Sequence, residues 1–250
     1  MSIEDEEPFT LAALMEFKKE ETERQEQFDR LQKEAEERFD GINEDEDDDS
    51  NKLIAEKGMS LFQEDWQLSQ FWYSDQTADI LADELLEGAD EETVICIASA
   101  PSVYAAIKKR DQSKLPTKQI YLLEFDKRFA VLAKDKFGFY DYNNPLEVLP
   151  GLKGKVNRLL IDPPFLQDDC QIKSSQTAHA LLSDDKTSKT KNGVLKYRLI
   201  SCTGERMKDI IKEVYTDTKP TDFYPEHANG LSNEFFCYAS YEGKNWKHQN

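Results

Sequence analysis

The chain has 250 residues, enough for one good-sized domain and an extension, and its formal net charge is −18. Residues 1–50 hold 20 acidic and 6 basic side chains, so most of the negative charge lies in the first fifth of the chain. No apolar run approaches the ~18 residues of a membrane span. The acidic start also lacks the basic segment of a secretory signal. We therefore expect neither a membrane-spanning segment nor an exported protein.

The cysteine and histidine residues predict neither a disulfide framework nor a metal site. The cysteines are widely spaced, without a C-x-x-C pair, and the three histidines show no metal-ligand spacing among themselves or with the cysteines. Unpaired cysteines in apolar runs are typical of a reducing compartment, and we expect the cytoplasm, with the nucleus as the alternative.

The acidic N-terminal segment, residues 1–50, is predicted to be an arm that precedes a domain at residues 51–250. Residues 9–39 lack glycine and proline and carry a thin apolar stripe, which predicts one or two helices with a mostly solvated surface. The run Glu44–Asp49 contains only acidic residues, whose mutual repulsion favours disorder. Such an arm suits a basic protein partner, although it is equally compatible with a solvated tail that only aids solubility.

Short apolar strands alternate with amphipathic helices through the rest of the chain. The patterns predict strands over 94–98, 120–125, 137–140, 156–161, 197–202 and 235–241, and helices over 74–87, 102–110, 127–136, 174–182 and 205–215. A short strand near 221–224 is expected to pair with the last strand. A loop rich in Lys, Ser and Thr is predicted over about 184–193, and the basic run 186–196 is expected to form one flexible loop. This alternation predicts an α/β domain with a largely parallel central sheet.

The ends of the first three strands carry groups that suit a nucleotide-like ligand, which α/β sheets bind outside the carboxyl ends of their strands. Small residues at 98–102 let a ligand approach the backbone and the free N–H groups of the next helix. Glu124 and Asp126 follow the second strand, where a carboxylate accepts hydrogen bonds from ribose hydroxyls. The third strand ends in a polar cluster, residues 141–144, that can bond an adenine amino group. Each feature alone is compatible with an ordinary turn or a helix cap.

The fourth strand ends in Asp162-Pro163-Pro164-Phe165, and this motif predicts an amine target. Proline lacks an N–H and fixes φ, so the two prolines stop the strand and stiffen its end. The Asp162 carboxylate and the Pro163 carbonyl can accept hydrogen bonds from a nitrogen that gains a methyl group, and the carboxylate stabilises the charge that develops there. The Phe165 ring can stack on a base or attract an ammonium group. The motif does not choose between lysine and adenine.

Taken together and in chain order, the motifs at the four strand ends resemble those of the class I S-adenosylmethionine-dependent methyltransferases that methylate amino groups. More closely, W-Q-L-S-Q-F-W-Y-S, A-S-A-P-S-V-Y, E-F-D-K-R-F, F-Y-D-Y-N-N-P, D-P-P-F-L, C-T-G and N-E-F-F-C-Y resemble the eukaryotic lysine methyltransferases that modify translation elongation factor 1-alpha. The resemblance runs from about Trp66 to Tyr241. It implies a Rossmann-like fold with a mostly parallel sheet and a C-terminal antiparallel strand pair. It also implies S-adenosylmethionine as cofactor and elongation factor 1-alpha as protein substrate.

The resemblance places three groups of site residues on this sequence. Those expected to bind the cofactor are Gln70, Tyr73, Ala98, Ser99, Ala100, Ser102, Glu124, Asp126, Asp141 and Tyr142. Those expected to act in catalysis are Asp162, Pro163, Pro164 and Phe165, and those expected to face the substrate are Phe165, Asn233 and Glu234.

One departure from the broad methyltransferase pattern concerns the first turn, which usually carries two or three glycines. Ser99 to Ser102 contain none, as in the narrower family. Residues 70–73 are expected either to close this end of the cofactor site or to form an aromatic core under the sheet.

Two other functions stay open on the residues. The first is an adenine amino methyltransferase of nucleic acid, which usually needs a basic face for phosphate contacts. Residues 51–250 hold 30 acidic and 26 basic side chains, so we expect no DNA partner and favour a protein target. The second is a non-catalytic binding protein whose first turn has lost the cofactor. The sequences G-x-S-x-G and G-x-x-x-x-G-K-[ST] are absent, so neither a nucleophile elbow nor a phosphate-binding loop is expected.

Overall fold

A computed structural model describes Met59, Phe62 and residues 70–230 and 234–249 of the chain. The chain divides into two compact units, Met1–Asp47 and Asp48–Asn250, and every described residue belongs to the second. The predicted arm and the predicted helices at 9–39 lie outside the described residues. The arm-and-domain division therefore stays a prediction.

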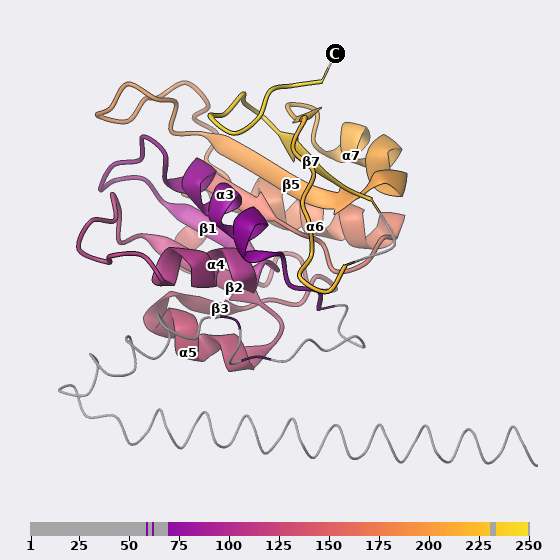
Figure 1. The fold of residues 1–250 in the computed structure, drawn as a ribbon, viewed down its shortest axis with the longest axis horizontal. Coiled ribbons are helices and arrows are strands. Elements are labelled where there is room, and N and C mark those ends of the chain that lie inside the picture. Colours follow the sequence, from indigo (N-terminus) through magenta and orange to yellow (C-terminus); the bar gives the residue numbers. More distant parts are fainter. Residues whose placement is uncertain (1–58, 60–61, 63–69, 231–233, 250) are drawn as a thin grey trace, which may run out of the picture. The chain divides into compact units, whose positions relative to one another are not determined.

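The described residues form a seven-stranded sheet in the order β3-β2-β1-β4-β5-β7-β6 (Figure 1). The first five strands in this order pair in parallel, and β7 runs antiparallel to both β5 and β6. The predicted fold class, a mostly parallel sheet with a C-terminal antiparallel pair, is confirmed. The strands are β1 (Ile95–Ala98), β2 (Ile120–Glu124), β3 (Phe137–Phe139), β4 (Arg158–Ile161), β5 (Arg198–Gly204), β6 (Lys219–Pro220) and β7 (Phe235–Ala239).

Helices cover both faces of the sheet and bury alternate strand residues. Ile95 and Ile97 of β1 pack with α3, α4 and α5, whereas Cys96 and Ala98 pack with α6 and α7. This period of two follows from the pleat of a strand, which turns successive side chains to opposite faces. The α-helices are α3 (Asp75–Leu86), α4 (Pro101–Lys108), α5 (Ala130–Ala133), α6 (Asp168–Leu181) and α7 (Lys208–Val214), and the 3₁₀ helices are η4 (Lys127–Phe129), η5 (Lys134–Lys136), η6 (Pro150–Leu152) and η7 (Glu205–Met207). None of the helices in the described part of the chain has the length and apolarity needed to cross a bilayer.

Several predicted elements differ from those observed, and three show the physical reasons. The single helix expected over 127–136 is split into η4, α5 and η5, with Lys134 at a φ of 50° that interrupts the α-helix. Helix α6 begins at Asp168, six residues before the predicted start. The acidic residues of its first turn stabilise this start, because they interact favourably with the positive end of the helix dipole. Strand β6 lies at Lys219–Pro220, before the predicted 221–224. Pro220 fits into this strand because β6 is an edge strand, where proline is tolerated.

The basic run 186–196 is a loop without a regular helix or strand, as predicted, and hydrogen bonds anchor it to the turn between α3 and β1. Thr190 Oγ1 donates to the Gly88 carbonyl at 2.7 Å, the Lys191 N–H donates to Asp90 Oδ2 at 2.8 Å, and Asn192 Nδ2 donates to the Ala89 carbonyl at 3.0 Å. The lysines at 186, 191 and 196 form ion pairs with acidic side chains of the same domain. These pairs reduce the positive charge that the segment presents to a partner.

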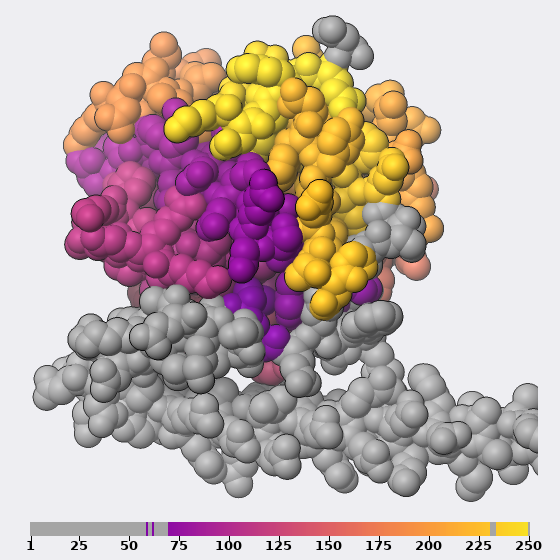
Figure 2. Space-filling model, viewed as in Figure 1, coloured from indigo at the N-terminus to yellow at the C-terminus, as the bar shows by residue number. Residues whose placement is uncertain are grey.

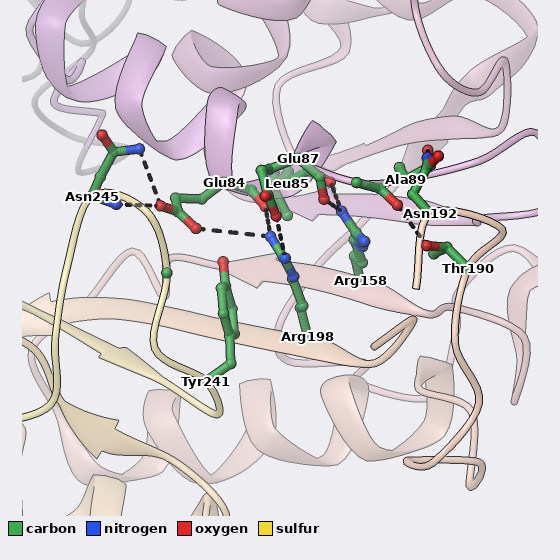
Figure 3. Close-up of polar contacts among 12 residues, drawn as sticks. Glu84, Leu85, Glu87, Ala89, Arg158, Thr190, Asn192, Arg198, Tyr241 and Asn245 are labelled. Carbon is green, nitrogen blue, oxygen red and sulfur yellow. Dashed lines mark hydrogen bonds and ion pairs between the residues drawn. The ribbon is translucent and has the colours of Figure 1, made fainter. Parts of the chain in front are cut away.

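Buried arginines tie the amino ends of β4 and β5 to the end of α3 (Figure 3). Arg158 Nη1 donates to the carbonyls of Leu85 and Glu87, both at 2.7 Å, and so caps the helix. Arg198 lies between Glu84 and Glu87, with its Nη2 at 2.6 Å from Glu87 Oε2 and its Nη1 at 3.8 Å from Glu84 Oε2. Burial, with the neighbouring Arg198 charge, lowers the pKa of Arg158 to about 10. This network lies at the edge of the sheet opposite the carboxyl strand ends.

Candidate active site

A cavity of about 590 Å³ opens at the carboxyl ends of β1, β2, β3 and β4. Most residues predicted for the site line this cavity, which we call the central cleft. They are Gln70, Tyr73, Ser99, Ala100, Ser102, Glu124, Asp141, Tyr142, Asp162, Pro163, Pro164 and Phe165. Their convergence follows from the parallel strand order, which brings four separate strand ends to one edge.

Asp162 directly follows β4 and is held by bonds from both its backbone and its side chain. Its N–H donates to the Ala98 carbonyl at 3.1 Å, and the Tyr73 hydroxyl donates to its Oδ2 at 2.5 Å. Burial of the carboxyl group raises the pKa of Asp162 to about 7, although the Tyr73 hydrogen bond opposes the shift. Burial and the nearby Asp162 charge raise the pKa of Tyr73, so its hydroxyl stays protonated as the donor. The cleft therefore contains a carboxyl group that exchanges a proton near neutral pH.

The remainder of the motif forms a stiff aromatic wall. Pro163 and Pro164 line the cleft, and the Phe165 ring contacts the Tyr142 ring at 5.7 Å between centroids in an edge-on arrangement. The Phe165 carbonyl accepts a bond from Gln171 Nε2 at 3.2 Å, which ties the motif to α6. An apolar wall beside a carboxylate suits an amine, because it disfavours the charged form of the nitrogen.

Glu124, at the end of β2, faces the central cleft from another strand. Its Oε1 accepts bonds from the N–H groups of Phe125 at 2.9 Å and Asp126 at 3.2 Å. Within the described chain, its Oε2 accepts no hydrogen bond. Burial raises the pKa of Glu124 to about 7, against the effect of the backbone bonds. A buried carboxyl group with one unused oxygen in a cleft is a good acceptor for ligand hydroxyls.

Two residues predicted to touch a cofactor do not line the central cleft. Ala98 is fully buried in β1, and its carbonyl positions Asp162. Asp126 is 1% exposed; its Oδ2 lies 2.6 Å from Arg128 Nη2 and accepts a bond from Gln70 Nε2 at 2.9 Å. It also caps η4 by accepting the Arg128 N–H at 2.9 Å. These two residues are therefore not among those that line the central cleft, and their contact with a cofactor stays a prediction.

The first turn adopts a glycine-like backbone without glycine. Ser99 has a φ of 59°, in the left-handed region, and α4 begins two residues later at Pro101. A non-glycine residue costs about 1 kcal/mol or more in this region. Glycine adopts this backbone without that cost.

Residues 70–73 lie between the central cleft and the hydrophobic core, and their closing of a cofactor site stays a prediction. All four line the central cleft, while Trp72 and Tyr73 also belong to the buried core between the sheet and α3. The Trp72 ring meets the Phe129 ring edge-on at 5.4 Å between centroids.

Sequence reasoning missed Arg206 and His227, which also line the central cleft. A bridge between Tyr73 and His227 brings the latter across more than 150 positions of chain, and no local pattern announces such a pairing. Arg206 Nη2 donates to the Leu166 carbonyl at 2.6 Å. Of the predicted substrate residues, Asn233 lies outside the described residues, and Glu234 lines a neighbouring cavity.

The parallel sheet, its strand order and the Asp-Pro-Pro-Phe wall at the end of β4 define an α/β methyltransferase. A family model described as "Probable N6-adenine methyltransferase" matches residues 64–243. "Protein-lysine N-methyltransferase EFM5" of Saccharomyces cerevisiae is 61% identical over 238 residues, which cover 95% of this chain and 92% of the yeast protein. The chain therefore belongs to this methyltransferase family, which includes protein-lysine N-methyltransferases.

Animal relatives extend the same similarity. "EEF1A lysine methyltransferase 1" of Danio rerio is 39% identical, over 71% of this chain and 98% of the fish protein. The Mus musculus protein of the same name is 36% identical, over 74% of this chain and 78% of its own length. Among solved structures, a protein-(glutamine-N5) methyltransferase from Alicyclobacillus acidocaldarius aligns with a TM-score of 0.35 and 12% identity, over 66% of this chain and 90% of that chain. The family assignment depends on the sequence relatives.

Proposed function

We propose that this protein transfers a methyl group from S-adenosylmethionine to the ε-amine of a lysine in translation elongation factor 1-alpha. The observation that carries the chemistry is the Asp162 carboxyl group, which lies in the central cleft with a pKa of about 7 beside the Phe165 wall. The choice of substrate is supported by the names of the relatives in mouse and zebrafish.

The residues of the central cleft fit the proposed cofactor. The unused Oε2 of Glu124 is an acceptor for ribose hydroxyls, and the Ser99 turn brings backbone close to the ligand at the start of α4. When bound, S-adenosylmethionine supplies an electrophilic methyl group on a positively charged sulfur. The residues proposed to hold it are Gln70, Tyr73, Ser99, Ala100, Ser102, Glu124, Asp141 and Tyr142.

The target lysine must lose its proton before it can act as a nucleophile. A free lysine has a pKa of about 10.4, so deprotonation at neutral pH costs roughly 4–5 kcal/mol. Asp162, with a pKa of about 7, accepts that proton at working pH, as a general base should. The Pro163 carbonyl accepts a further hydrogen bond from the amine. Positioning of this kind supplies up to about 7–11 kcal/mol toward the barrier.

Methylation of adenine in nucleic acid is the second candidate, favoured by the description of the family model. It receives less support from the surface charge, because three of the four lysines of the anchored run 186–196, at 186, 191 and 196, are paired with acidic side chains. Phosphate contacts supply most non-specific affinity of nucleic-acid enzymes, and these lysines are occupied elsewhere.

The test is mass spectrometry of purified elongation factor 1-alpha after incubation with S-adenosylmethionine and the protein. We expect mass gains in multiples of one methyl group, which are lost with Asp162→Ala. Asp184→Ala is the matched control, because Asp184 is exposed and its carboxylate makes no hydrogen bond within the described residues. No gain with wild-type protein that demonstrably binds the cofactor would contradict this substrate. Nuclease-sensitive methylation of RNA or DNA in the same assay would favour the second candidate.

A further inference from the structure

A second cavity of about 720 Å³ adjoins the central cleft, and the two share His227 and Phe235 as lining residues. We call it the outer cavity. Its other lining residues come from the segment before β7 and from β7 itself, namely Tyr224, Pro225, Glu226, Gly230, Glu234 and Phe236.

Aromatic rings form a continuous row from Asp162 to the outer cavity. The Tyr73 hydroxyl bonds Asp162 at 2.5 Å, and the Tyr73 ring lies 5.0 Å from the His227 ring between centroids. The His227 ring in turn meets the Phe235 ring edge-on at 4.5 Å. Aromatic rings suit the aliphatic stem of a lysine and also attract its ammonium end. A lysine side chain can therefore pack along this row of rings and reach Asp162 in the central cleft.

Backbone hydrogen bonds build the wall of the outer cavity onto the segment that enters α3. The Ser74 N–H donates to the Glu226 carbonyl at 2.8 Å, and the Ala228 N–H donates to the Trp72 carbonyl at 2.8 Å. Figure 2 shows these two distant parts of the chain, in purple and gold, side by side on one face. The Tyr224 and Phe236 rings, which also line the outer cavity, meet edge-on at 5.3 Å between centroids. The wall of the outer cavity is thus fixed by backbone hydrogen bonds between these two segments.

The charged side chains that line the outer cavity are acidic. Glu226 and Glu234 are both exposed, and neither carboxylate has a hydrogen bond or ion pair among the described residues. Elsewhere in the domain, Glu91, Glu92 and Asp217 are paired with lysines. Unpaired carboxylates around a cavity attract cationic groups and repel phosphate.

From this arrangement we propose that the outer cavity receives the substrate surface around the target lysine, with Glu226 and Glu234 selecting basic residues there. The inference rests on the proposed transfer to a protein lysine. It adds the chemical class of the recognised surface, a cationic protein face, and it assigns to the same carboxylates the rejection of nucleic acid. Glu226 and Glu234 act on binding and are not catalytic residues.

The test compares steady-state kinetics of wild type, the double variant Glu226→Gln/Glu234→Gln and the control Glu213→Gln. Glu213 is an exposed residue of α7 that is absent from the lining of both cavities. With elongation factor 1-alpha, we expect the double variant to raise KM about threefold to tenfold, the effect of losing two exposed charge pairs. Its kcat and its affinity for S-adenosylmethionine should stay at wild-type values, and added salt should raise KM less steeply than in wild type. The control should match wild type throughout.

A second arm separates failure of the substrate proposal from failure of this inference. Short lysine peptides with arginine, alanine or glutamate on both sides of the lysine are offered to the same three proteins. We expect arginine-flanked peptides to be methylated with the highest kcat/KM, and the preference over alanine to shrink at least threefold in the double variant. If the elongation factor is not methylated but this preference appears, the substrate proposal fails and the cavity proposal holds. An unchanged KM and an unchanged peptide preference in the double variant would overturn the cavity proposal, as would the absence of methylation of every substrate.

Discussion

Asp162 combines a buried carboxyl group with a place in the lining of the central cleft. We expect Asp162→Asn to lower kcat by about 10²–10⁴-fold, because the amide keeps the shape of the side chain but cannot take up the lysine proton. Cofactor affinity, measured by calorimetry, should change less than about threefold, which would separate a catalytic defect from a folding defect.

The pH profile of the wild-type enzyme should report the same group. Asp162 must be ionised to accept the proton, and its pKa is raised to about 7, so kcat/KM should rise between about pH 6 and pH 8. Asp162→Asn should lose the inflection near pH 7. A wild-type profile that is flat across this range would contradict the role of Asp162 as base.

Glu124 carries a prediction about stability. Its pKa in the folded state is raised to about 7 by burial, whereas a free glutamate has a pKa of about 4.3. The folded protein therefore holds this proton more tightly, and the associated stability is fully present below about pH 4 and is lost as the pH rises through about 7. Glu124→Gln removes the buried charge. We expect it to stabilise the protein at pH 8 by about 1–3 kcal/mol and to have little effect at pH 5, as measured by urea unfolding at both pH values.

The same substitution should weaken S-adenosylmethionine binding at pH 8 by about tenfold, since hydroxyl groups bond more strongly to a carboxylate than to an amide. Greater stability joined to weaker binding would mark Glu124 as a residue retained for function. A loss of stability at pH 8 would show that its charge is compensated in the folded protein.

Helix α3 depends on the buried network at the amino ends of β4 and β5 (Figure 3). Glu84 is 1% exposed, and its Oε1 accepts bonds from the Asn245 N–H at 2.6 Å and from Asn245 Nδ2 at 3.0 Å. Glu84→Ala leaves these donors unpaired and removes a carboxylate beside Arg198. We expect a loss of about 3–5 kcal/mol in the free energy of unfolding.

Glu87→Ala is the control for this network. Glu87 also pairs with Arg198, at 2.6 Å, but its side chain is 42% exposed. Solvent screens such a pair, so we expect a loss of at most about 1 kcal/mol. Equal losses for the two variants in urea unfolding would show that burial does not set the strength of the network.

At the scale of the whole molecule, the hydrophobic core of the described residues comes after the acidic N-terminal segment in the sequence. The buried residues that cover both faces of the sheet run from Trp72 to Trp246. We propose that residues 48–250 fold independently, and we expect this truncated protein to melt within about 2 °C of the full chain in calorimetry. A much lower Tm would assign residues 1–47 a part in the folded domain. Retained stability with a raised KM would instead support the arm as a contact for a basic partner.

Strong local patterns are sufficient to predict most of the fold. The apolar runs at 120–125 and 156–161 and the helical spacing at 74–87 correspond to β2, β4 and α3, because burial of one face leaves a periodic record in the sequence. The order of strands and helices along the chain also predicts that the four strand ends share one cleft, since parallel strands deliver their carboxyl ends to the same edge. Helix starts are harder to predict, as α6 shows. The first turn of this helix is polar, and its sequence resembles that of a loop.

Contacts between distant segments are decided only by the tertiary structure. The bridge between Tyr73 and His227, the Tyr73 hydrogen bond to Asp162 and the burial of Asp126 behind Gln70 have no periodic signature. The raised pKa of Asp162 likewise depends on what surrounds the carboxyl group. Residue types and their order thus identify the chemistry that the chain can perform, whereas packing determines which side chains face the cleft and in which protonation state, because burial and long-range neighbours set both.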